Sequence, residues 1–219
     1  MTTPQDMTLD ELREALGAIL PTHAAFDGWS PAALEASADQ LGVPADRARL
    51  AFPGGAVQMI DAWFATIDRA MAAAFPPERI ATMKIRDRIR ALVLFRIEMV
   101  APHREALRRA LAILALPTNV AQATRLGWRA ADAMWHGAGD RAADFAWYSK
   151  RFTLSALYAS TLLAFLDDES EHWADTRAFL DRRIEDVMRF ERLKARLKPH
   201  PERYFSPTRF LGRLRYPAM

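Results

Sequence analysis

Residues 144–165 read DFAWYSKRFTLSALYASTLLAF, and this stretch decides the fold. An apolar run without a helix breaker extends through it as far as Leu166. Residues three and four apart share one face of a helix, so two apolar stripes are expected here. One stripe contains Trp147, Arg151, Leu154, Tyr158, Leu162 and Phe165, and the other contains Tyr148, Phe152, Ala159, Leu163 and Leu166. A helix that is apolar nearly all round is expected inside a helical bundle.

The first two turns of this stretch carry a different signal. Asp144, the aromatic pair Trp147 and Tyr148, and the cations Lys150 and Arg151 are crowded there. Burying all of them costs free energy, whereas a binding surface uses these residue types. The apolar run by itself is also explained by a plain core helix. Two hypotheses therefore remain: a core helix, or a helix whose start forms the mouth of a binding site.

The composition indicates one soluble or peripheral domain. The chain has 219 residues, 51% of them hydrophobic, which is enough for a sizeable core. No apolar run approaches the roughly 18 residues needed to span a bilayer. Cysteine is absent, which excludes disulfides and thiolate metal sites. The N-terminus MTTPQDMTLDELR is acidic, with neither the apolar core of a secretion signal nor an Arg-rich transit segment, so a bacterial cytoplasm is expected.

Charge is distributed unevenly, although the net formal charge is only +3. Residues 1–60 contain three arginines and eight carboxylates, a net charge of −5. Residues 182–219 contain eleven Lys or Arg and four carboxylates, a net charge of +7. The two ends of the chain are therefore expected to have different partners.

The N-terminal part has the outline of a helix-turn-helix. Three helices are predicted, over residues 9–20, 31–41 and 44–51. Thr8 and Ser30 are the expected N-caps, and Gly42 ends the second helix. DNA binding depends on Lys and Arg that neutralise phosphates, and this segment is acidic. We therefore expect a retained scaffold that binds no nucleic acid.

Longer helices are predicted in the rest of the chain, over residues 56–74, 79–100, 105–114, 118–135, 144–166 and 169–197. Thr118 is the expected cap of the fourth of these. No segment alternates with a period of two, so no sheet is expected. The predicted fold class is all-α, a bundle of about nine helices. After a proline-rich linker that begins at Lys198, residues 206–216 are predicted to form a tethered, basic amphipathic helix.

Motifs that carry chemistry are weak in this sequence. Residues 137–142 loosely match a dinucleotide fingerprint but follow no strand. Glu169 and His172 have the Glu-x-x-His spacing of di-iron bundles, but the second such motif and the two further glutamates are absent from the sequence. No Gly-x-Ser-x-Gly elbow is present either. We predict that the chain is not an enzyme and holds no metal or cofactor.

An ordered set of motifs runs from about residue 10 to 215: Phe26-Asp-Gly-Trp29, Phe52-Pro-x-Gly55, Asp144-Phe-x-Trp147-Tyr148-x-Lys-Arg151, Leu157-Tyr158-x-Ser-Thr161 and Phe179-Leu-Asp-Arg-Arg183. This set resembles the ubiquinone-biosynthesis accessory lipid-binding proteins, the ninth coenzyme-Q protein family. Ala146 stands where that family usually has Asn. The resemblance implies a fold similar to TetR-type regulators, no catalysis, binding of isoprenoid lipids or quinone precursors, and support for a di-iron hydroxylase acting on demethoxyubiquinone.

The resemblance and the helix pattern divide the chain into three parts. Residues 1–75 are the helix-turn-helix-like part, 76–197 the lipid-binding and dimerisation bundle, and 198–219 the linker with a membrane-binding helix. An apolar pocket is predicted among helices 79–100, 118–136 and 144–166. Its expected lining and mouth are Leu92, Phe95, Met99, Met134, Trp135, Trp147, Tyr148, Arg151, Leu154, Tyr158 and Leu162. A solid core built of the same residues is the alternative.

Asp144, Trp147 and Tyr148 are predicted to form the docking patch for the di-iron hydroxylase, with Arg151 beside them at the pocket mouth. The planar guanidinium of Arg151 suits a lipid phosphate because it donates two parallel hydrogen bonds. The alternative is that Arg151 pairs with Asp144 or Asp181 inside the fold.

Two further interactions are expected. By the resemblance, a homodimer forms through helices 144–166 and 169–197. An anionic membrane is expected to bind Arg209, Phe210, Leu211, Arg213 and Leu214, which holds the protein peripherally at the inner face of the cytoplasmic membrane. The alternative function is a TetR-type transcriptional regulator with a hydrophobic ligand pocket, which the acidic N-terminal part opposes.

Overall fold

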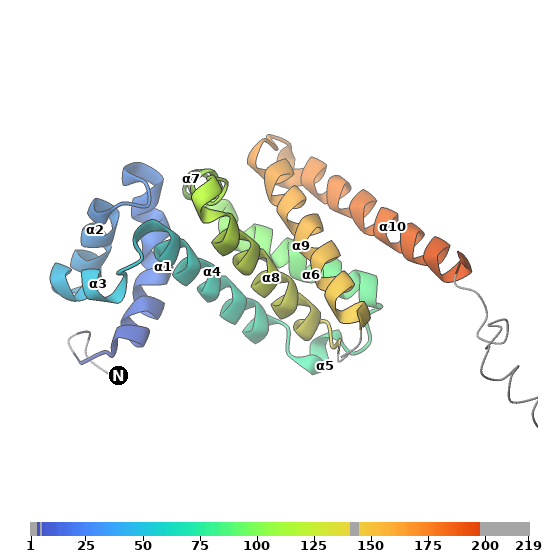
Figure 1. Cartoon of the computed structure of the whole chain (residues 1–219), viewed down its shortest axis with the longest axis horizontal. Helices are drawn as coiled ribbons and strands as arrows, with labels where there is room; N and C mark the ends of the chain where they lie inside the picture. Colours follow the sequence, from blue (N-terminus) through green and yellow to red (C-terminus); the bar gives the residue numbers. More distant parts are fainter. Residues whose placement is uncertain (1–3, 5, 141–144, 198–219) are drawn as a thin grey trace, which may run out of the picture. The chain divides into compact units, whose positions relative to one another are not determined.

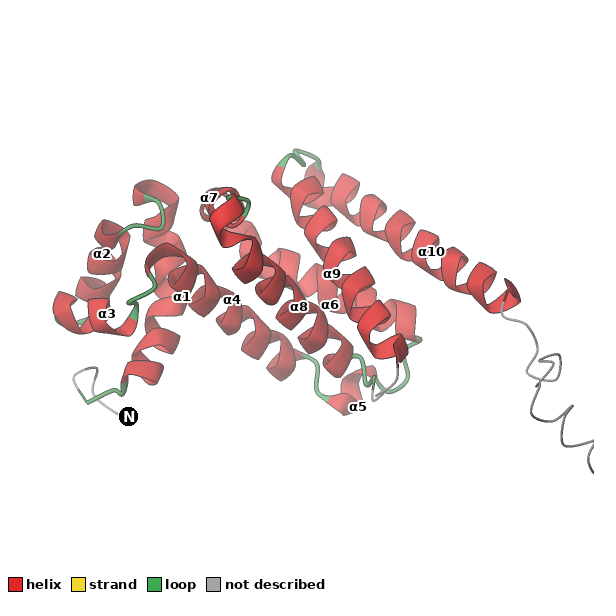
Figure 2. Ribbon diagram, in the orientation of Figure 1, coloured by secondary structure: helices red, strands yellow, loops and turns green. Residues whose placement is uncertain are grey.

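The computed structural model describes the backbone of residues 4, 6–140 and 145–197, and the side chains of residues 4, 6–140 and 148–190. Its α-helices are α1 (Leu9–Asp27), α2 (Pro31–Leu41), α3 (Ala45–Ala51), α4 (Gly55–Ala74), α5 (Pro77–Ile80), α6 (Ile85–Val100), α7 (Arg104–Leu114), α8 (Val120–Gly137), α9 (Phe145–Leu166) and α10 (Ala174–Leu197). Three short 3-10 turns are η1 (Ala101–His103), η2 (Pro117–Asn119) and η3 (Glu171–Trp173). These described ranges contain no strand, so the predicted all-α class is confirmed (Figure 2).

The first two N-terminal helices begin at the predicted caps. The Thr8 hydroxyl accepts a hydrogen bond from the backbone N–H of Glu11, and the Glu11 carboxylate accepts one from the backbone N–H of Thr8, which completes a capping box. Ser30 caps α2, and Gly42 ends it with a left-handed φ of 76°. α1 is longer than predicted, because it continues through Pro21 to Asp27. α2 and α3 pack on α1, as the helix-turn-helix outline requires (Figure 1).

α1 lies close against α4, and one glycine makes this possible. A Cβ added at Gly17 would stand 2.8 Å from the carbonyl oxygen of Ala62 on α4, closer than two such atoms approach. Beside this contact, the indole rings of Trp29 and Trp63 stack with centroids 5.4 Å apart. Trp29 also donates its indole N–H to the carbonyl of Ala106 on α7 at 2.9 Å. The N-terminal helices therefore share one core with the helices that follow.

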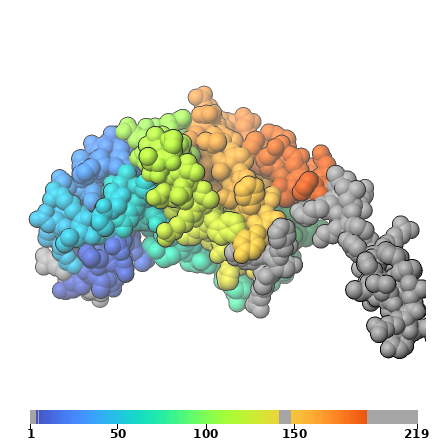
Figure 3. Space-filling model, in the orientation of Figure 1, coloured from blue at the N-terminus to red at the C-terminus, as the bar shows by residue number. Residues whose placement is uncertain are grey.

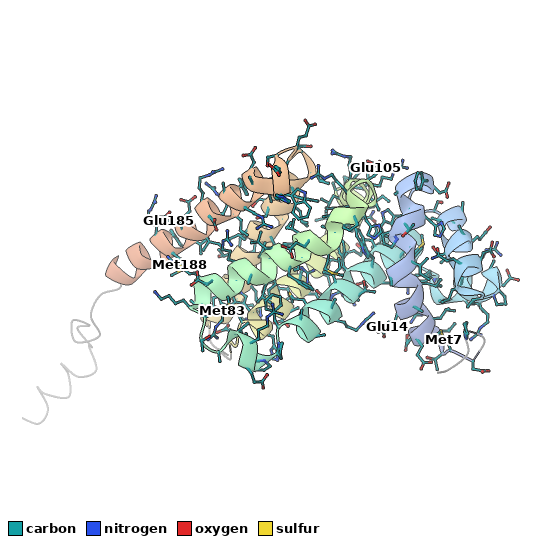
Figure 4. The ribbon with its side chains drawn as sticks, turned by 180° about the vertical axis from the view of Figure 1, so that it is seen from behind. Met7, Glu14, Met83, Glu105, Glu185 and Met188 are labelled. Atoms are coloured by element: carbon teal, nitrogen blue, oxygen red, sulfur yellow. The ribbon has the colours of Figure 1, made fainter. Side chains whose placement is uncertain are left out.

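The predicted helix over residues 79–100 is wrong in one respect, because the chain turns between α5 and α6. Arg88 donates to the carbonyl oxygens of Ala81, Met83 and Ala138 at 2.8–2.9 Å, so it satisfies groups that the break leaves open. α6 ends before Pro102, as predicted. Seen from behind, Met83 and Glu105 lie at opposite ends of this helix (Figure 4).

α8 and α9 form the closest helix pair of the second half. A Cβ added at Gly127 would stand 2.7 Å from the Oγ of Ser155, so glycine permits this approach. α8 begins at Val120, after the 3-10 turn η2, so the prediction that Thr118 caps it is wrong. α8 also packs on α4, α6 and α7, and α9 packs on α6 (Figures 1 and 4). These helices surround the pocket described below.

Asp168 fixes the turn between α9 and α10. One carboxylate oxygen accepts hydrogen bonds from the backbone N–H and hydroxyl of Ser170, at 2.8 and 2.5 Å. The other accepts from the backbone N–H and hydroxyl of Thr176, at 2.8 and 2.6 Å. Burial acts to raise the pKa of Asp168, but these hydrogen bonds outweigh it and lower the pKa from 3.8 to about 2.

We predict that this carboxylate stabilises the fold above about pH 4 and loses its contribution as the pH falls toward 2. A carboxyl group with a lowered pKa favours folding only while it is ionised, and a shift of nearly two units is worth about 2 kcal/mol. Asp168→Ala should therefore unfold more easily than wild type in urea at pH 6, and the difference should shrink at pH 2.5. Asp167→Ala, at the exposed neighbouring position, is the control. A difference that does not change with pH would contradict the prediction.

The chain divides into two units, residues 1–181 and 182–219. Residues 1–75 therefore lie in the same unit as α5 to α9. In the second unit, Arg183 pairs with Asp186 at 2.7 Å along α10. The predicted membrane-binding residues Arg209, Phe210, Leu211, Arg213 and Leu214 lie outside the described residues.

Candidate functional site

An apolar pocket of about 280 Å³ lies among α4, α6, α7, α8 and α9. Its lining residues are Phe64, Arg96, Leu111, Leu114, Ala115, Ala123, Leu126, Gly127, Ala130, Ser155, Tyr158, Ala159, Leu162 and Leu163. Polar side-chain atoms come only from Arg96, Ser155 and Tyr158 among these. Pockets for small molecules are typically about 300–1,000 Å³, apolar, with few polar groups. At about 280 Å³ this pocket is slightly smaller than that range, and its lining is of the expected kind.

Figure 3 shows the face of the molecule that carries α8 and α9, and these two helices supply most of the pocket lining. Ala115, Ala159 and Leu163 are exposed and form its rim. Arg96, Tyr158 and Leu162 are buried and form its inner wall. A ligand in this pocket therefore has apolar contacts at the opening and polar groups at its inner end.

Arg96 is the unusual residue of the inner wall, because its side chain is 0% exposed. It forms an ion pair with Asp68 on α4, and its guanidinium lies over the ring of Tyr158, 4.9 Å from the centroid. Burial acts to lower the pKa of Arg96, but Tyr158 and Asp68 outweigh it and the pKa is raised. Arg96 is therefore a cation inside the protein.

The ion pair of Arg96 belongs to a longer chain of charges across α4, α6 and α8. Asp68 also accepts from the Nε of Arg129 at 3.1 Å. Arg129 in turn pairs with Asp61, about two turns before Asp68 on α4. Two arginines thus face two aspartates, so the cluster has no excess charge.

Only some of the residues predicted to line the pocket do line it. Tyr158 and Leu162 line the pocket as predicted. Met134 and Leu154 are buried and do not line it, so for these two the solid-core alternative is correct, whereas Leu92 is buried and lines a different cleft. Helical periodicity placed them on apolar faces, but it does not say which apolar face borders a cavity.

Phe95, Met99 and Trp135 also lie elsewhere. Phe95 packs edge-on against Phe75, with centroids 5.6 Å apart, and Met99 is exposed. Trp135 donates its indole N–H to the carbonyl of Lys150 at 3.0 Å. Successive residues of a helix are 100° apart, so Phe95 lies on a different face of α6 from Arg96.

A second, larger cleft of about 680 Å³ lies on the other side of Arg129 and includes Leu92. Its lining contains five charged or imidazole side chains, Asp68, Arg69, Arg129, Asp132 and His136. Four of these five are in ion pairs: Asp68 and Arg129 with each other, Arg69 with Glu14 and Asp132 with Arg151. The smaller pocket is therefore the better candidate for an apolar ligand.

The placement of Arg151 at an open mouth is wrong. Its side chain is 3% exposed, and its Nε donates to Asp132 on α8 at 2.5 Å. Its Nη1 lies 3.8 Å from Asp140, which also pairs with Lys150 at 2.9 Å. The alternative of an internal ion pair is correct, but with different partners. Asp181 instead pairs with Arg90 at 2.5 Å, and Asp144 lies outside the described residues.

The outer face of α9 is more exposed than the sequence indicates. Tyr148 is 60%, Phe152 72% and Leu163 58% exposed, so α9 is not buried on all sides. The ring of Tyr148 lies 6.1 Å from that of Trp128 on α8. The side chain of Trp147 lies outside the described part. Phe152, which sequence reasoning did not single out, shares the predicted stripe of Tyr148 and continues the exposed face one turn later.

The arrangement of the helices identifies the fold class of the protein. The structure is similar to that of the TetR transcriptional regulator from Nitrosomonas europaea ATCC 19718, with a TM-score of 0.65 over 82% of this chain and 99% of that chain, at 25% sequence identity. The chain is therefore a TetR-like helical protein, as predicted.

The amino-acid sequence is similar to that of one protein family. Residues 120–191 match the COQ9 family model. The ubiquinone biosynthesis protein COQ9, mitochondrial, of Rattus norvegicus is 42% identical over 100 residues, which cover 46% of this chain and 32% of that protein. The Bos taurus protein of the same name is 31% identical over 176 residues, covering 77% of this chain and 54% of that protein. The resemblance to the ninth coenzyme-Q family is thus confirmed, and the chain spans about a third to a half of these curated relatives.

Proposed function

We propose that this chain is a non-enzymatic, lipid-binding accessory protein of ubiquinone biosynthesis. The observation that carries the proposal is the apolar pocket, most of whose lining comes from α8 and α9, inside the segment that matches the COQ9 family. The relatives are named for ubiquinone biosynthesis, whose intermediates carry isoprenoid tails. An isoprenoid quinone precursor is therefore the proposed ligand.

Energetics supports a partly enclosed tail. Burial of one five-carbon isoprene unit is worth on the order of 4 kcal/mol at about 0.8 kcal/mol per CH₂. A pocket of about 280 Å³ has room for a ring or a short part of a tail, and the remainder of a long tail lies along the exposed apolar face. When the ligand binds in this pocket, most of a long isoprenoid tail therefore stays outside it, in contact with a membrane or a partner protein.

The proposed partner is a di-iron hydroxylase that acts on demethoxyubiquinone. The exposed face of α9, with Tyr148 and Phe152, supports this part of the proposal because large aromatic residues dominate interface energetics. This face continues to Leu163 at the pocket rim, so a hydroxylase bound there lies beside the ligand. Pairing of two chains through α9 and α10 stays a prediction.

Attachment to a membrane is proposed to be peripheral. Among the described residues, no helix is long and apolar enough to cross a bilayer. The relatives named above are mitochondrial proteins by name, whereas the inner face of the cytoplasmic membrane is proposed here. In both settings the isoprenoid substrate resides in a membrane.

Gene replacement tests the proposed function. Deleting the gene in the source organism should lower ubiquinone and cause the demethoxy precursor to accumulate, and the wild-type chain should restore ubiquinone. Tyr148→Ala should fold normally, because the side chain is exposed, but restore ubiquinone poorly. Leu50→Ala, at an exposed apolar position on α3, is the matched control and should restore it fully. Unchanged quinones in the deletion strain would refute the proposal, and full restoration by Tyr148→Ala would remove α9 from the docking surface.

The alternative is a TetR-type regulator, which the structural similarity favours. The arginines of residues 1–60 oppose it, because each already has a hydrogen-bond acceptor within the protein. Arg13 donates to the carbonyl of Ala51 at 2.6 Å, Arg47 to that of Met7 at 2.5 Å, and Arg49 to Glu35 at 2.6 Å. Phosphate binding would have to displace these contacts in a segment with a net charge of −5.

A further inference from the structure

The Nε of Arg96 is a buried hydrogen-bond donor that has no acceptor. In the described part of the chain, only one other buried side-chain atom has no hydrogen-bond partner, the Oδ2 of Asp140. That oxygen lies 3.8 Å from the guanidinium of Arg151, so an opposite charge faces it. Arg96 uses its Nη1 for Asp68, but its Nε has no partner. A buried donor left unsatisfied costs free energy, so a missing partner is expected.

Arg96 borders the pocket, so a pocket ligand is the candidate for that missing partner. Arg96 lines the inner wall, together with Tyr158, whose ring the guanidinium covers. The rim at Ala115, Ala159 and Leu163 is apolar and exposed. A ligand that fills the pocket can therefore present an oxygen to Arg96 while its tail leaves between α7 and α9.

The charges around Arg96 decide what kind of oxygen fits. Asp68 faces both Arg96 and Arg129, and Asp61 also faces Arg129. This cluster is already neutral, so a carboxylate or phosphate would bring an unbalanced negative charge into an apolar pocket. An uncharged carbonyl or ether oxygen accepts the hydrogen bond without that cost.

We propose that Arg96 is a specificity-determining residue, whose Nε donates a hydrogen bond to an uncharged oxygen on the ring of a pocket ligand. The ligand enters ring first, and its tail leaves past Ala159 and Leu163. This inference rests on the proposed lipid binding and adds to it a ligand orientation and a preference for neutral carbonyl or ether groups over acidic ones.

Three matched probes test the preference on the wild-type protein. Decyl-1,4-benzoquinone carries neutral carbonyl oxygens, decylbenzene has no acceptor, and 4-decylbenzoate carries a charge. Each competes with a fluorescent lipid for the purified protein, which contains no cysteine for the quinone to alkylate. The quinone should bind about tenfold more tightly than decylbenzene, and the benzoate more weakly than the quinone.

Equal binding of quinone and decylbenzene would overturn the role of Arg96, and tightest binding of the benzoate would overturn the charge argument. Binding of none of the three would instead refute lipid binding in this pocket.

The variant Arg96→Lys tests the residue itself. Lysine retains a cation opposite Asp68 but has no Nε donor at that position. The ratio of the quinone and decylbenzene affinities should fall from about ten to about one. Leu163→Ala, at the rim, should weaken both probes equally and keep the ratio. A purely structural role of Arg96 predicts that Arg96→Lys also keeps the ratio, which would contradict the proposal. If Arg96→Lys does not fold, the comparison of probes on wild type decides.

Discussion

Asp68→Ala should lower the free energy of unfolding by about 3–5 kcal/mol, because it leaves a fully buried arginine without its counter-charge. Arg96 is 0% exposed, and no other carboxylate of the described residues lies within an ion-pair distance of it. For a chain of this size, a loss of that magnitude lowers the melting temperature by roughly 6–20 °C. Urea unfolding followed by circular dichroism measures the change.

Two variants distinguish the loss of the counter-charge of Arg96 from a general destabilisation of α4. Asp61→Ala removes a half-buried carboxylate from the same helix, and Arg129 retains Asp68, so the loss should be no more than about 1 kcal/mol. The double variant Asp68→Leu with Arg96→Met replaces the buried charges by apolar groups and should recover much of the stability lost in Asp68→Ala. Equal losses for Asp61→Ala and Asp68→Ala would show that Arg96 does not depend on this charge.

Ala159→Trp should weaken lipid binding at least tenfold and leave the melting temperature nearly unchanged. Ala159 is exposed at the rim, so a larger side chain there is tolerated by the helix but can fold over the pocket opening. An indole is a large, rigid apolar group, so it can cover the opening of a cavity of about 280 Å³. Competition with a fluorescent lipid measures the affinity.

Ala156→Trp is the matched control. Ala156 is exposed on the same helix three residues earlier but does not line the pocket. The control should retain the lipid affinity of the wild type. If both variants lose binding equally, the lipid lies along the outer face of α9, and if neither does, the lipid binds outside this pocket.

Much of the fold follows from local sequence signals. The N-caps at Thr8 and Ser30 and the helix end at Gly42 were each predicted from two or three neighbouring residues, and each is present. The break between α5 and α6 was not predicted, because Arg88 stabilises it through the carbonyl of Ala138, fifty residues away. Local patterns do not contain such a contact.

The pocket lining was predicted less completely than the helices, because it too depends on contacts between residues distant in the sequence. Tyr158 and Leu162 were correctly placed on the inner stripe of α9. Arg96 was visible as a cation on the apolar face of its helix, but nothing in the sequence indicated that Asp68 and Tyr158 would meet it. Arg151 was assigned to a ligand because its true partners could not be seen in the sequence. Asp132 lies on the preceding helix and Asp140 in the loop after it, and only the fold brings them to Arg151.

Native mass spectrometry of the full chain, with and without an added isoprenoid quinone precursor, tests most directly whether the pocket holds such a lipid. The wild-type protein should carry one extra mass per chain, either a co-purified isoprenoid lipid or the added precursor, and Ala159→Trp should not. A wild-type chain that is lipid-free and takes up no precursor would contradict lipid binding.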